Sequence, residues 1–505
     1  MKWLIPVFLI IILSCSKKET GIVTNDSTQY SERYRPQYHF SPDKNWTNDP
    51  NGLVYYEGEY HIFYQYNPYG NTWGHMSWGH AVSKDLLHWE QLPVAIAEYQ
   101  NPSGDSTMIF SGTVVVDKNN SSGFCEGKDC LIAVYTSHVH KDGQGKLQHQ
   151  SLAYSNDKGR TWKRYDKNPV LDIQRKDFRD PKIFWYETGN VWIAAMVVPD
   201  LFKVVFYKST NLKEWTALGE FGGIGDTSKI WECPDLFELP VEGEPGKTKW
   251  ILSLSGSHPA GGKFVGMQYF VGVFNGNTFI PDQSTQAPLY MDFGKDFYAG
   301  IIYNNIPKED GRTIMIGWAN NWAYGNQIPT STWRSAMALP RELSLKKTAA
   351  GLRLIQQPLK TISSLRGDEM KGEISGNQLE LEVEIDIAKS KGAGIKILKS
   401  ESEETIIGYD ATTQEVFIDR THSGDVGFHK EFASIDRVKI DASTGKIKLQ
   451  VFVDHSIVEV FVNNGEQTLC EQVFPLANDA RVIPYSENND GVISVRAWKI
   501  NRTWK

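Results

Sequence analysis

The sequence has no long run of basic residues, and its acidic side chains slightly outnumber its basic ones. With 53 Lys and Arg against 60 Asp and Glu, the formal net charge is −7. Because nucleic-acid binding requires clustered positive charge, we expect no nucleic acid among the partners. At 505 residues the chain is long enough for a large core and for two or more domains.

Cysteine is also scarce, with five residues in the whole chain. Cys233 and Cys470 stand far apart and form no Cys-x-x-Cys pattern, so the sequence does not favour a zinc site. Cys125 and Cys130 could close a small disulfide loop in an oxidising compartment, with free thiols as the alternative.

The N-terminus has the features of an export signal. Lys2 precedes an apolar run over residues 3–13, which is too short to span a bilayer but has the length of a signal-peptide core. The run ends in Ile12-Leu13-Ser14-Cys15, which resembles the lipobox of bacterial lipoproteins; an ordinary signal peptide with an incidental cysteine is the alternative. We therefore expect a signal peptide over 1–15, a lipid anchor on Cys15 and a flexible polar tether over 16–33, on a membrane face that the tether does not specify.

Helical periodicity is poor throughout, and only residues 292–299 and 359–365 could carry a short turn of helix. Aromatic residues make up 12% of the chain, which suits an all-β protein with most rings in the core and some free to stack on a ligand. Three segments repeat a strand, a serine, a polar turn and a tryptophan: residues 81–89, 153–162 and 207–215.

A second repeated feature is a short polar or acidic motif that leads directly into an apolar strand. It recurs at positions 49, 111, 180, 233 and 297. Five units built of short strands predict a five-bladed β-propeller over residues 34–354, in which the motifs face one another around the central axis. Alternating strands at 378–385, 447–453 and 457–462 then predict a C-terminal β-sandwich over 355–505.

The run Trp46-Thr47-Asn48-Asp49-Pro50-Asn51-Gly52 holds a carboxylate among residues that restrict or bend the backbone. Pro50 fixes its own φ and favours extended geometry at Asp49, while Asn51 and Gly52 tolerate positive φ. We therefore expect a stiff turn here, followed by strands at 53–56 and 60–66. Taken alone, a run of this kind is in most proteins an ordinary turn, so the evidence for a catalytic role comes from elsewhere in the chain.

Four acidic residues stand at the predicted starts of inner strands: Asp49, Asp180, Glu232 and Asp296. Glycoside hydrolysis needs one carboxyl group to protonate the leaving oxygen and another to attack the anomeric carbon or activate water. Each of the later three also has a structural explanation. Asp180 could pair with Arg179 or cap a turn, Glu232 could be a buried core ion with its partners satisfied, and Asp296 could have a structural role. Their joint recurrence at blade-like intervals favours a shared site.

The segments Asn48-Asp49-Pro50-Asn51-Gly52, Arg179-Asp180-Pro181 and Glu232-Cys233-Pro234 resemble the three acidic motifs of glycoside hydrolase family 32, the invertase, inulinase and levanase family. Further segments match at 63–68, 78–81, 110–112, 292–299 and 317–320. One departure is Thr47, where many members carry Met. The resemblance extends from about residue 38 to the C-terminus.

The resemblance implies a five-bladed propeller with a β-sandwich, and retaining hydrolysis of β-fructofuranosyl bonds in levan, inulin or sucrose. Asp49 would be the nucleophile, Glu232 the acid/base and Asp180 the transition-state stabiliser, with the first two carboxyls roughly 5 to 5.5 Å apart. No metal or organic cofactor is implied. The residues expected to hold the terminal fructose are Asn48, Gln65, Trp73, Phe110, Ser111, Arg179, Tyr298 and Trp318.

Two other functions fit parts of the sequence. One is a propeller glycosidase that acts on arabinose-containing polymers with three acidic residues and typically inverts. The other is a lectin-like lipoprotein that keeps aromatic platforms such as Trp73 and Trp318 without activity. Linkage preference and endo or exo action depend on loops at 101–108 and 256–266; we favour exo action. The sequence does not indicate the oligomeric state.

Overall fold

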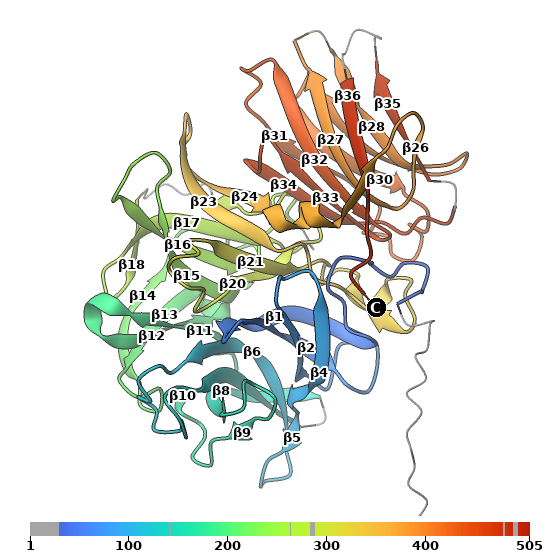
Figure 1. Ribbon diagram of the computed structural model, residues 1–505. Coiled ribbons are helices and arrows are strands. Elements are labelled where there is room, and N and C mark those ends of the chain that lie inside the picture. The colour runs from blue at the N-terminus through green and yellow to red at the C-terminus, as the bar shows by residue number, and fades with distance from the viewer. Residues whose placement is uncertain are drawn as a thin grey trace, which may run out of the picture.

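The computed structural model describes residues 30–504, apart from 142, 263, 283–287, 389, 478–479 and 488–492. Almost every element is a β-strand, and the chain forms a propeller followed by a sandwich, which lie at the lower left and upper right of Figure 1. The predicted signal peptide and Cys15 lie outside the described residues. Within the described part, no helix has the length and apolar character needed to cross a membrane.

The first three propeller sheets are antiparallel and follow one another along the chain. The first contains β1 (Asn45–Tyr56), β2 (Glu59–Asn67), β3 (Ser77–Ser83) and β4 (Trp89–Ile96), with β22 (Trp333–Arg334) paired parallel to β1. The second contains β5 (Tyr99–Gln100), β6 (Ser106–Val116), β7 (Leu131–Lys141), β8 (Gln144–Ser155), β9 (Lys163–Arg164) and β10 (Leu171–Arg175). The third contains β11 (Arg179–Tyr186), β12 (Val191–Val198), β13 (Lys203–Ser209) and β14 (Thr216–Gly222).

Two further sheets complete the propeller. The fourth contains β15 (Glu232–Pro240), β16 (Thr248–Ser255), β17 (Met267–Phe274), β18 (Phe279–Pro281) and β19 (Leu289–Tyr290). The fifth contains β20 (Tyr298–Ile302), β21 (Thr313–Trp318), β23 (Arg341–Thr348) and β24 (Gly351–Pro358). Short 3-10 helices occur at η1 (Glu187–Gly189), η2 (Pro199–Leu201) and η3 (Gly325–Gln327).

The innermost strands of the five sheets form a closed ring. Each contacts its two neighbours, in the order β1, β6, β11, β15, β20 and back to β1. The motifs that the sequence repeats lie within these strands or directly before them, so the predicted convergence of those motifs around one axis is confirmed.

The inner strands share a second feature, an irregularity of pairing near their starts. The register shifts between Thr47 and Pro50 in β1 and between Ile109 and Gly112 in β6. Shifts at 179/182, 232/235 and 298/301 follow in β11, β15 and β20. Bulges of this kind re-aim side chains and are common beside active sites. Here they present the repeated polar motifs to one end of the ring.

The stiff turn expected at residues 46–52 is wrong, because the whole run lies within β1. Its backbone is bent by bulges in a strand and does not reverse direction. Gly52 has the positive φ that the sequence suggested, +52°, and a Cβ there would lie 2.6 Å from Val114 Cγ2 and 2.8 Å from Phe63 Cδ2. The strand, turn and strand expected after it are confirmed as the hairpin of β1 and β2.

The serine and tryptophan repeat forms the same turn in three sheets, at the ends of β3, β8 and β13. The serine Oγ accepts a hydrogen bond from a backbone N–H three or four residues on. The pairs are Ser83 with Leu86 (2.8 Å), Ser155 with Gly159 (2.9 Å) and Ser209 with Leu212 (2.8 Å). The repeated sequence therefore reflects one recurring local structure.

The β-sandwich consists of two six-stranded sheets. The first has the order β25 (Arg366–Glu369), β36 (Ile493–Ile500), β27 (Gln378–Asp386), β32 (Lys446–Asp454), β33 (Ile457–Val462) and β34 (Gln467–Gln472). The second has the order β26 (Ile374–Ser375), β35 (Arg481–Ser486), β28 (Gly392–Lys399), β29 (Glu404–Asp410), β30 (Glu415–His422) and β31 (Ile435–Lys439). Their inward-facing aliphatic residues form one core. The helical turn expected at 359–365 is confirmed as the 3-10 helix η4 (Lys360–Leu365), whereas residues 292–299 contain no helix.

The edges of the two parts differ slightly from the sequence expectation. Residue 354 lies inside β24 of the fifth propeller sheet, and β25 of the sandwich begins at Arg366. Tyr30, in the last part of the predicted tether, is buried, and its ring stacks on Trp504 at 4.3 Å. The fold therefore already includes Tyr30.

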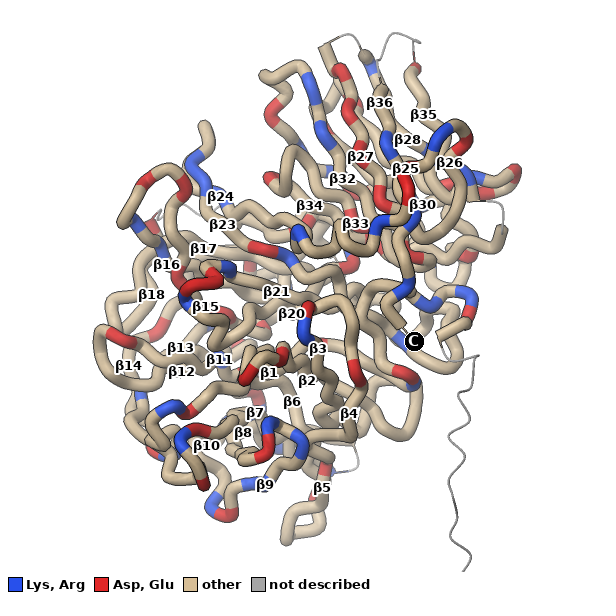
Figure 2. Tube along the Cα trace, in the orientation of Figure 1, with Lys and Arg blue, Asp and Glu red and all other residues tan. Residues whose placement is uncertain are grey.

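Buried ion pairs join the propeller to the sandwich. Asp296 accepts a hydrogen bond from Arg420 Nη1 at 2.5 Å, and Arg341 contacts Asp292 at 2.8 Å and Glu459 at 2.7 Å. Because breaking a buried pair leaves an uncompensated charge, these contacts hold the two parts in register. Asp296 thus has the structural role that the sequence allowed. Along the chain, residues of both charge signs are distributed over both parts (Figure 2).

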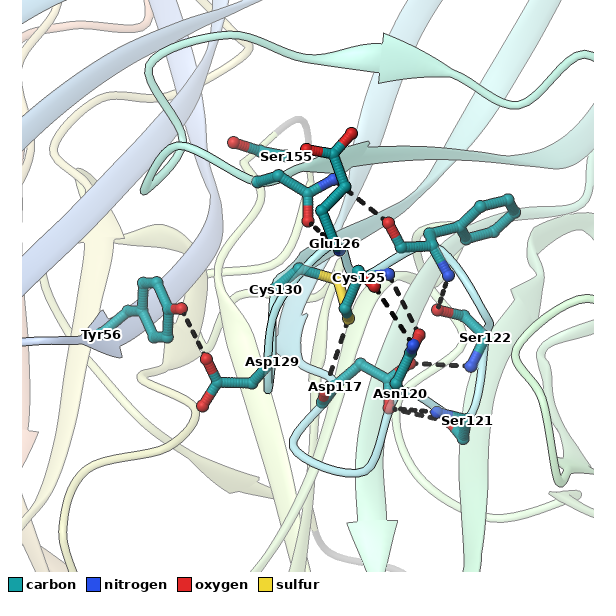
Figure 3. Close-up of a disulfide and its surroundings, with 12 residues drawn as sticks. Tyr56, Asp117, Asn120, Ser121, Ser122, Cys125, Glu126, Asp129, Cys130 and Ser155 are labelled. Carbon is teal, nitrogen blue, oxygen red and sulfur yellow. Dashed lines mark hydrogen bonds between the residues drawn. A yellow bond between two sulfur atoms is a disulfide. The ribbon is translucent and has the colours of Figure 1, made fainter.

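Cys125 and Cys130 form a disulfide with 5.2 Å between their Cα atoms (Figure 3). It closes a loop between β6 and β7. The sequence left a disulfide and free thiols open for this pair, and the structure shows the disulfide. Cys233 and Cys470 are free and buried.

Candidate active site

A cavity of about 340 Å³ lies at the end of the ring where the inner strands begin. Its lining includes the three predicted catalytic carboxylates and six of the eight predicted fructose-binding residues. The lining residues are Asn48, Asp49, Gln65, Trp73, Phe110, Ser111, His138, Gln148, Asp177, Arg179, Asp180, Glu232 and Trp322. The bulges of four inner strands thus converge on one chamber.

Asp49 is buried and held by a hydrogen bond on each carboxylate oxygen. Asn48 Nδ2 donates to Oδ1 at 2.9 Å and Ser111 Oγ donates to Oδ2 at 2.8 Å. The indole of Trp46 donates to Asn48 Oδ1 at 2.7 Å, which orients the Asn48 amide. Burial raises the pKa of Asp49, with a further contribution from the charge of Glu232, while the bonds from Asn48 and Ser111 oppose the rise. The carboxylate is therefore fixed in direction and poorly solvated.

Asp180 occupies a bulge with a left-handed backbone, at φ +61°. Its N–H donates to Thr136 Oγ1 at 3.0 Å, and its Oδ2 accepts a hydrogen bond from the Cys233 N–H at 3.0 Å. Burial raises the pKa of Asp180 to about 7; the charge of Arg179 opposes this and that of Glu232 adds to it. Left-handed geometry at a residue other than glycine is unfavourable and often marks a functional site. Cys233, with φ +45°, has the same position in the next inner strand.

Glu232 is bracketed by a cation and a phenol. Arg179 Nη2 lies 2.9 Å from Glu232 Oε1, and the Tyr298 hydroxyl donates to Oε2. Arg179 Nε also lies 3.7 Å from Asp180 Oδ2, so one guanidinium contacts two of the three carboxylates. The Glu232 side chain is 24% exposed and that of Asp180 is 6% exposed, so Glu232 is the more accessible to a ligand or to water.

Aromatic rings form one wall of the chamber. Trp73 is 41% exposed, and its ring lies edge-on to Phe110 at 6.2 Å. Phe110 in turn stacks on His138 at 4.4 Å. Gln65 is fixed beneath this wall, because its Nε2 donates to Asn51 Oδ1 at 2.7 Å and to the Ile109 carbonyl at 3.0 Å. Such a wall offers apolar faces to sugar C–H groups and leaves polar atoms for hydroxyls.

Two predicted binding residues lie behind the lining. Tyr298 is buried and reaches the chamber through its bond to Glu232. Trp318 is fully buried and packs against Trp322 at 4.9 Å, and it is Trp322 that lines the cavity. The structure therefore places Trp318 as support for the floor.

The sequence prediction did not include four lining residues: His138, Gln148, Asp177 and Trp322. Asp177 precedes the Arg179-Asp180 motif and contacts Arg179 at 3.2 Å, so its proximity to the motif was a usable signal. His138 and Gln148 face each other across β7 and β8, with 3.1 Å between His138 Nδ1 and Gln148 Nε2. No local pattern marks these two strand positions.

The described residues contain no group of three or more His, Cys, Asp or Glu side chains that could hold a metal ion. The chemistry that the chamber can perform with its own residues is acid–base and nucleophilic, because it combines three carboxylates with one guanidinium.

Comparison with known proteins identifies the family. Residues 39–358 match the glycosyl hydrolases family 32 N-terminal domain, and residues 350–499 match the family 32 C-terminal domain. A levanase from Bacillus subtilis is 44% identical over 496 residues, which covers 94% of this chain and 71% of the levanase. An extracellular exo-inulinase from Aspergillus awamori is 42% identical, covering 94% of this chain and 96% of its own length.

Solved structures agree. A crystal structure of the exo-inulinase from Aspergillus awamori superposes with a TM-score of 0.86 at 40% identity, covering 94% of this chain and 100% of that one. A fructofuranosidase from Schwanniomyces occidentalis complexed with fructose gives a TM-score of 0.84 at 31% identity, with coverage of 94% and 100%. The predicted propeller and sandwich are therefore the architecture that this chain shares with these relatives. The chain is a glycoside hydrolase and belongs to glycosyl hydrolase family 32.

Proposed function

We propose that this protein is a retaining β-fructofuranosidase that releases fructose from the ends of levan or inulin and also hydrolyses sucrose. The observation that carries the proposal is the convergence of Asp49, Asp180 and Glu232, from three different inner strands, on one chamber. Relatives that match over 94% of this chain are named levanase, exo-inulinase and fructofuranosidase, which supports fructosyl bonds as the substrate.

In the first step, Glu232 donates its proton to the glycosidic oxygen while Asp49 attacks the anomeric carbon, C2, of the terminal fructosyl unit. The bond from C2 to the leaving oxygen breaks, and the fructosyl group becomes an ester of Asp49. Asn48 and Ser111 hold the Asp49 carboxylate with one hydrogen bond on each oxygen, so its direction is set before substrate arrives.

In the second step, the Glu232 carboxylate removes a proton from a water molecule, and the resulting oxygen attacks C2 from the side the leaving group vacated. Asp49 is released as a carboxylate, and Glu232 regains its proton. Two inversions at C2 give net retention. The greater exposure of Glu232 suits a group that must meet both the leaving oxygen and water.

Asp180 and Arg179 have supporting roles in this proposal. Asp180 accepts hydrogen bonds from fructosyl hydroxyls as positive charge develops on the ring. Arg179 sets the distance between Asp180 and Glu232, because its guanidinium contacts both. Burial of Asp180 and Arg179 strengthens their electrostatic effect on the transition state.

The shape of the chamber supports cleavage at chain ends. Its floor is backed by a packed cluster of Trp46, Trp318 and Trp322, with ring separations of 4.9 to 6.0 Å. We infer that this packed side of the chamber admits a terminal unit only, and that the rest of the polymer leaves past the exposed Trp73. The name of the exo-inulinase relative agrees with this mode.

We further propose that the protein is exported and anchored to a membrane through lipidated Cys15. The Cys125–Cys130 disulfide supports an oxidising compartment, and extracellular relatives support export. Labelling cells with a palmitate analogue should tag the full chain and leave the Cys15→Ser variant untagged. Equal labelling of both would overturn the anchor.

The decisive experiment for the activity is incubation of the purified protein with levan, inulin and sucrose, followed by chromatography of the products. Free fructose should be the first product from each polymer, without intermediate oligosaccharides. Glu232→Gln and Asp49→Asn should be folded and inactive. Release of oligosaccharides first would overturn exo action, and no release from any substrate would overturn the proposed function.

A further inference from the structure

A second cavity, of about 380 Å³, lies at the opposite end of the propeller from the carboxylates. Its walls come from the far end of β6 and the loop after it, from the far end of β11, and from Asn304 and Asn305 after β20. Asp180 and Trp185 lie on the same strand, five residues apart, which places the two cavities roughly 17 Å from each other.

The second cavity does not continue the first. The buried Lys182 and Asp235 lie on inner strands between the two ends, with 3.0 Å from Lys182 Nζ to Asp235 Oδ1. Lys182 Nζ also donates to the Ile302 carbonyl at 3.1 Å. Because this ion pair occupies the space between the strands, a sugar chain in the active site cannot reach the second cavity through the propeller.

Aromatic rings in the second cavity are partly exposed and held in place. Phe184 and Trp185 are half-buried at the end of β11. Trp185 lies edge-on to Trp192, with 5.1 Å between rings and 72° between planes. Trp192 Nε1 donates to Ser121 Oγ at 2.9 Å, which ties these rings to the loop after β6. A fixed ring face of this kind suits the C–H face of a sugar.

The neighbouring amides present acceptors. Asn304 Nδ2 donates to the carbonyls of Val114 at 3.0 Å and Ile183 at 3.2 Å, and Asn305 Nδ2 donates to the Tyr55 carbonyl at 2.8 Å. These bonds assign the orientation of both amides. Neither Oδ1 accepts a hydrogen bond from any residue that the structure describes, so both remain available to hydroxyl donors.

The loop after β6 is rigid before any ligand binds. Asp117 accepts hydrogen bonds from the N–H groups of Ser121 at 2.8 Å and Ser122 at 2.7 Å, and the Cys125–Cys130 disulfide closes the same loop (Figure 3). The Asp117 carboxylate is thus engaged by its own loop. A preformed wall lowers the entropy cost of binding. The remaining charges at the cavity, Lys118 and Glu187, are of opposite sign, which suits a neutral ligand.

We propose that this cavity is a non-catalytic binding site for a neutral oligosaccharide, with Trp185 as the stacking platform and Asn304 and Asn305 as hydroxyl acceptors. The identification of that oligosaccharide as fructan rests on the proposed function. The evidence for the binding site itself is independent of that function. With Asp117 engaged by its loop, the cavity has no pair of free carboxylates and binds without cleaving. Holding a polymer here raises its effective concentration beside the active site.

The test uses the full chain carrying Glu232→Gln, so that bound sugar is not consumed. Calorimetric titration with a fructo-oligosaccharide of five units should show two sites per chain. Adding Trp185→Ala should weaken the second site at least tenfold and leave the first unchanged. Asn119→Trp, a change at an exposed position that fills the cavity from the loop, is the second variant should Trp185→Ala fail to fold.

A matched titration with a malto-oligosaccharide of the same length shows whether the second site binds fructan or glucan. Binding of fructan at the second site supports the full proposal, and binding of the glucan alone supports the site while replacing its ligand. The proposal of a second binding site would be overturned by either of two results. The chain carrying Glu232→Gln alone could show one site, or it could show two sites whose affinities Trp185→Ala and Asn119→Trp leave unchanged. Trp185→Ala in the otherwise native chain should hydrolyse sucrose at the rate of the native protein. If neither protein hydrolyses sucrose, the proposed function fails, and this result is independent of the titrations that test the second site.

Discussion

The guanidinium of Arg179 lies against the carboxylate of Glu232, with 2.9 Å between Nη2 and Oε1. The same guanidinium reaches Asp180 through Nε at 3.7 Å. One planar side chain therefore spaces two carboxylates that come from different sheets. Both contacts use nitrogens in a fixed geometry, which a lysine cannot reproduce.

Arg179→Lys should retain the fold and lower kcat/KM on sucrose by about 100-fold, because the positions of Asp180 and Glu232 are no longer set together. Thermal unfolding checks the fold, and initial rates check the loss. A rate within threefold of the parent would show that the charge alone is sufficient.

Ser111→Ala removes the hydrogen bond that stabilises the charged form of Asp49 through Oδ2. Because that bond lowers the pKa of Asp49, its loss raises the pKa, and the acid limb of kcat/KM should move to higher pH. The pH profile of sucrose hydrolysis measures the shift. Thr113→Ser, on the same strand and outside the cavity lining, is a control that should leave the limb in place. An acid limb that stays or moves to lower pH would contradict the role of Ser111.

Pro50→Ala should lower turnover about tenfold while changing the free energy of unfolding by less than ~1 kcal/mol. The reason is that Pro50 ends the bulge that carries Asp49, at the register shift after Thr47. Gly52→Ala is the contrasting variant. Its Cβ would meet Val114 and Phe63 at positive φ, so stability should fall first. If Pro50→Ala loses stability while each folded molecule turns over normally, the proline is structural.

His39 makes stability depend on pH at the junction of propeller and sandwich. Burial alone would lower its pKa, but hydrogen bonds to Asp454 at 2.8 Å and Glu459 at 3.1 Å raise it from 6.5 to about 9. Protonated His39 therefore stabilises the folded state fully below pH 6.5, and this stabilisation is lost as the pH rises through 9. It amounts to about 3 kcal/mol.

Urea unfolding of the parent and of His39→Gln at pH 6.5 and 9 measures this dependence. The parent should lose about 2.5 kcal/mol more than the variant over that interval, because His39 is still half protonated in the folded state at pH 9. An equal loss in both proteins would show that His39 does not carry the effect.

The sequence was sufficient for the architecture and for the carboxylates because both are encoded by repeats. Asp49, Asp180 and Glu232 stand at repeated motifs, and the same bulge at each inner strand brings them together. His138 and Gln148 could not be predicted, since their meeting depends on the register of β7 and β8 within one sheet. The sequence predicts Trp318 in the lining because it does not show that Trp322 covers that residue.

The backbone of the first motif also differs from the expectation. Asp, Pro, Asn and Gly together favour a reversing turn, but residues 46–52 lie in a strand that is paired with β2 along its length. Pairing with β2 determines the conformation of this segment, and the residues that favour turns lie at the bulges of the strand. The interdomain role of Asp296 likewise depends on Arg420, which is 124 residues away in the chain.

The central claim, that Asp49 forms a covalent fructosyl intermediate, is tested most directly by hydrolysing sucrose in the presence of methanol. Methanol replaces water in the second step, and its product does not interconvert between anomers, so NMR of the purified methyl fructofuranoside reports the stereochemistry. A double displacement at Asp49 predicts methyl β-fructofuranoside. Methyl α-fructofuranoside would mean a single displacement and would contradict the role assigned to Asp49.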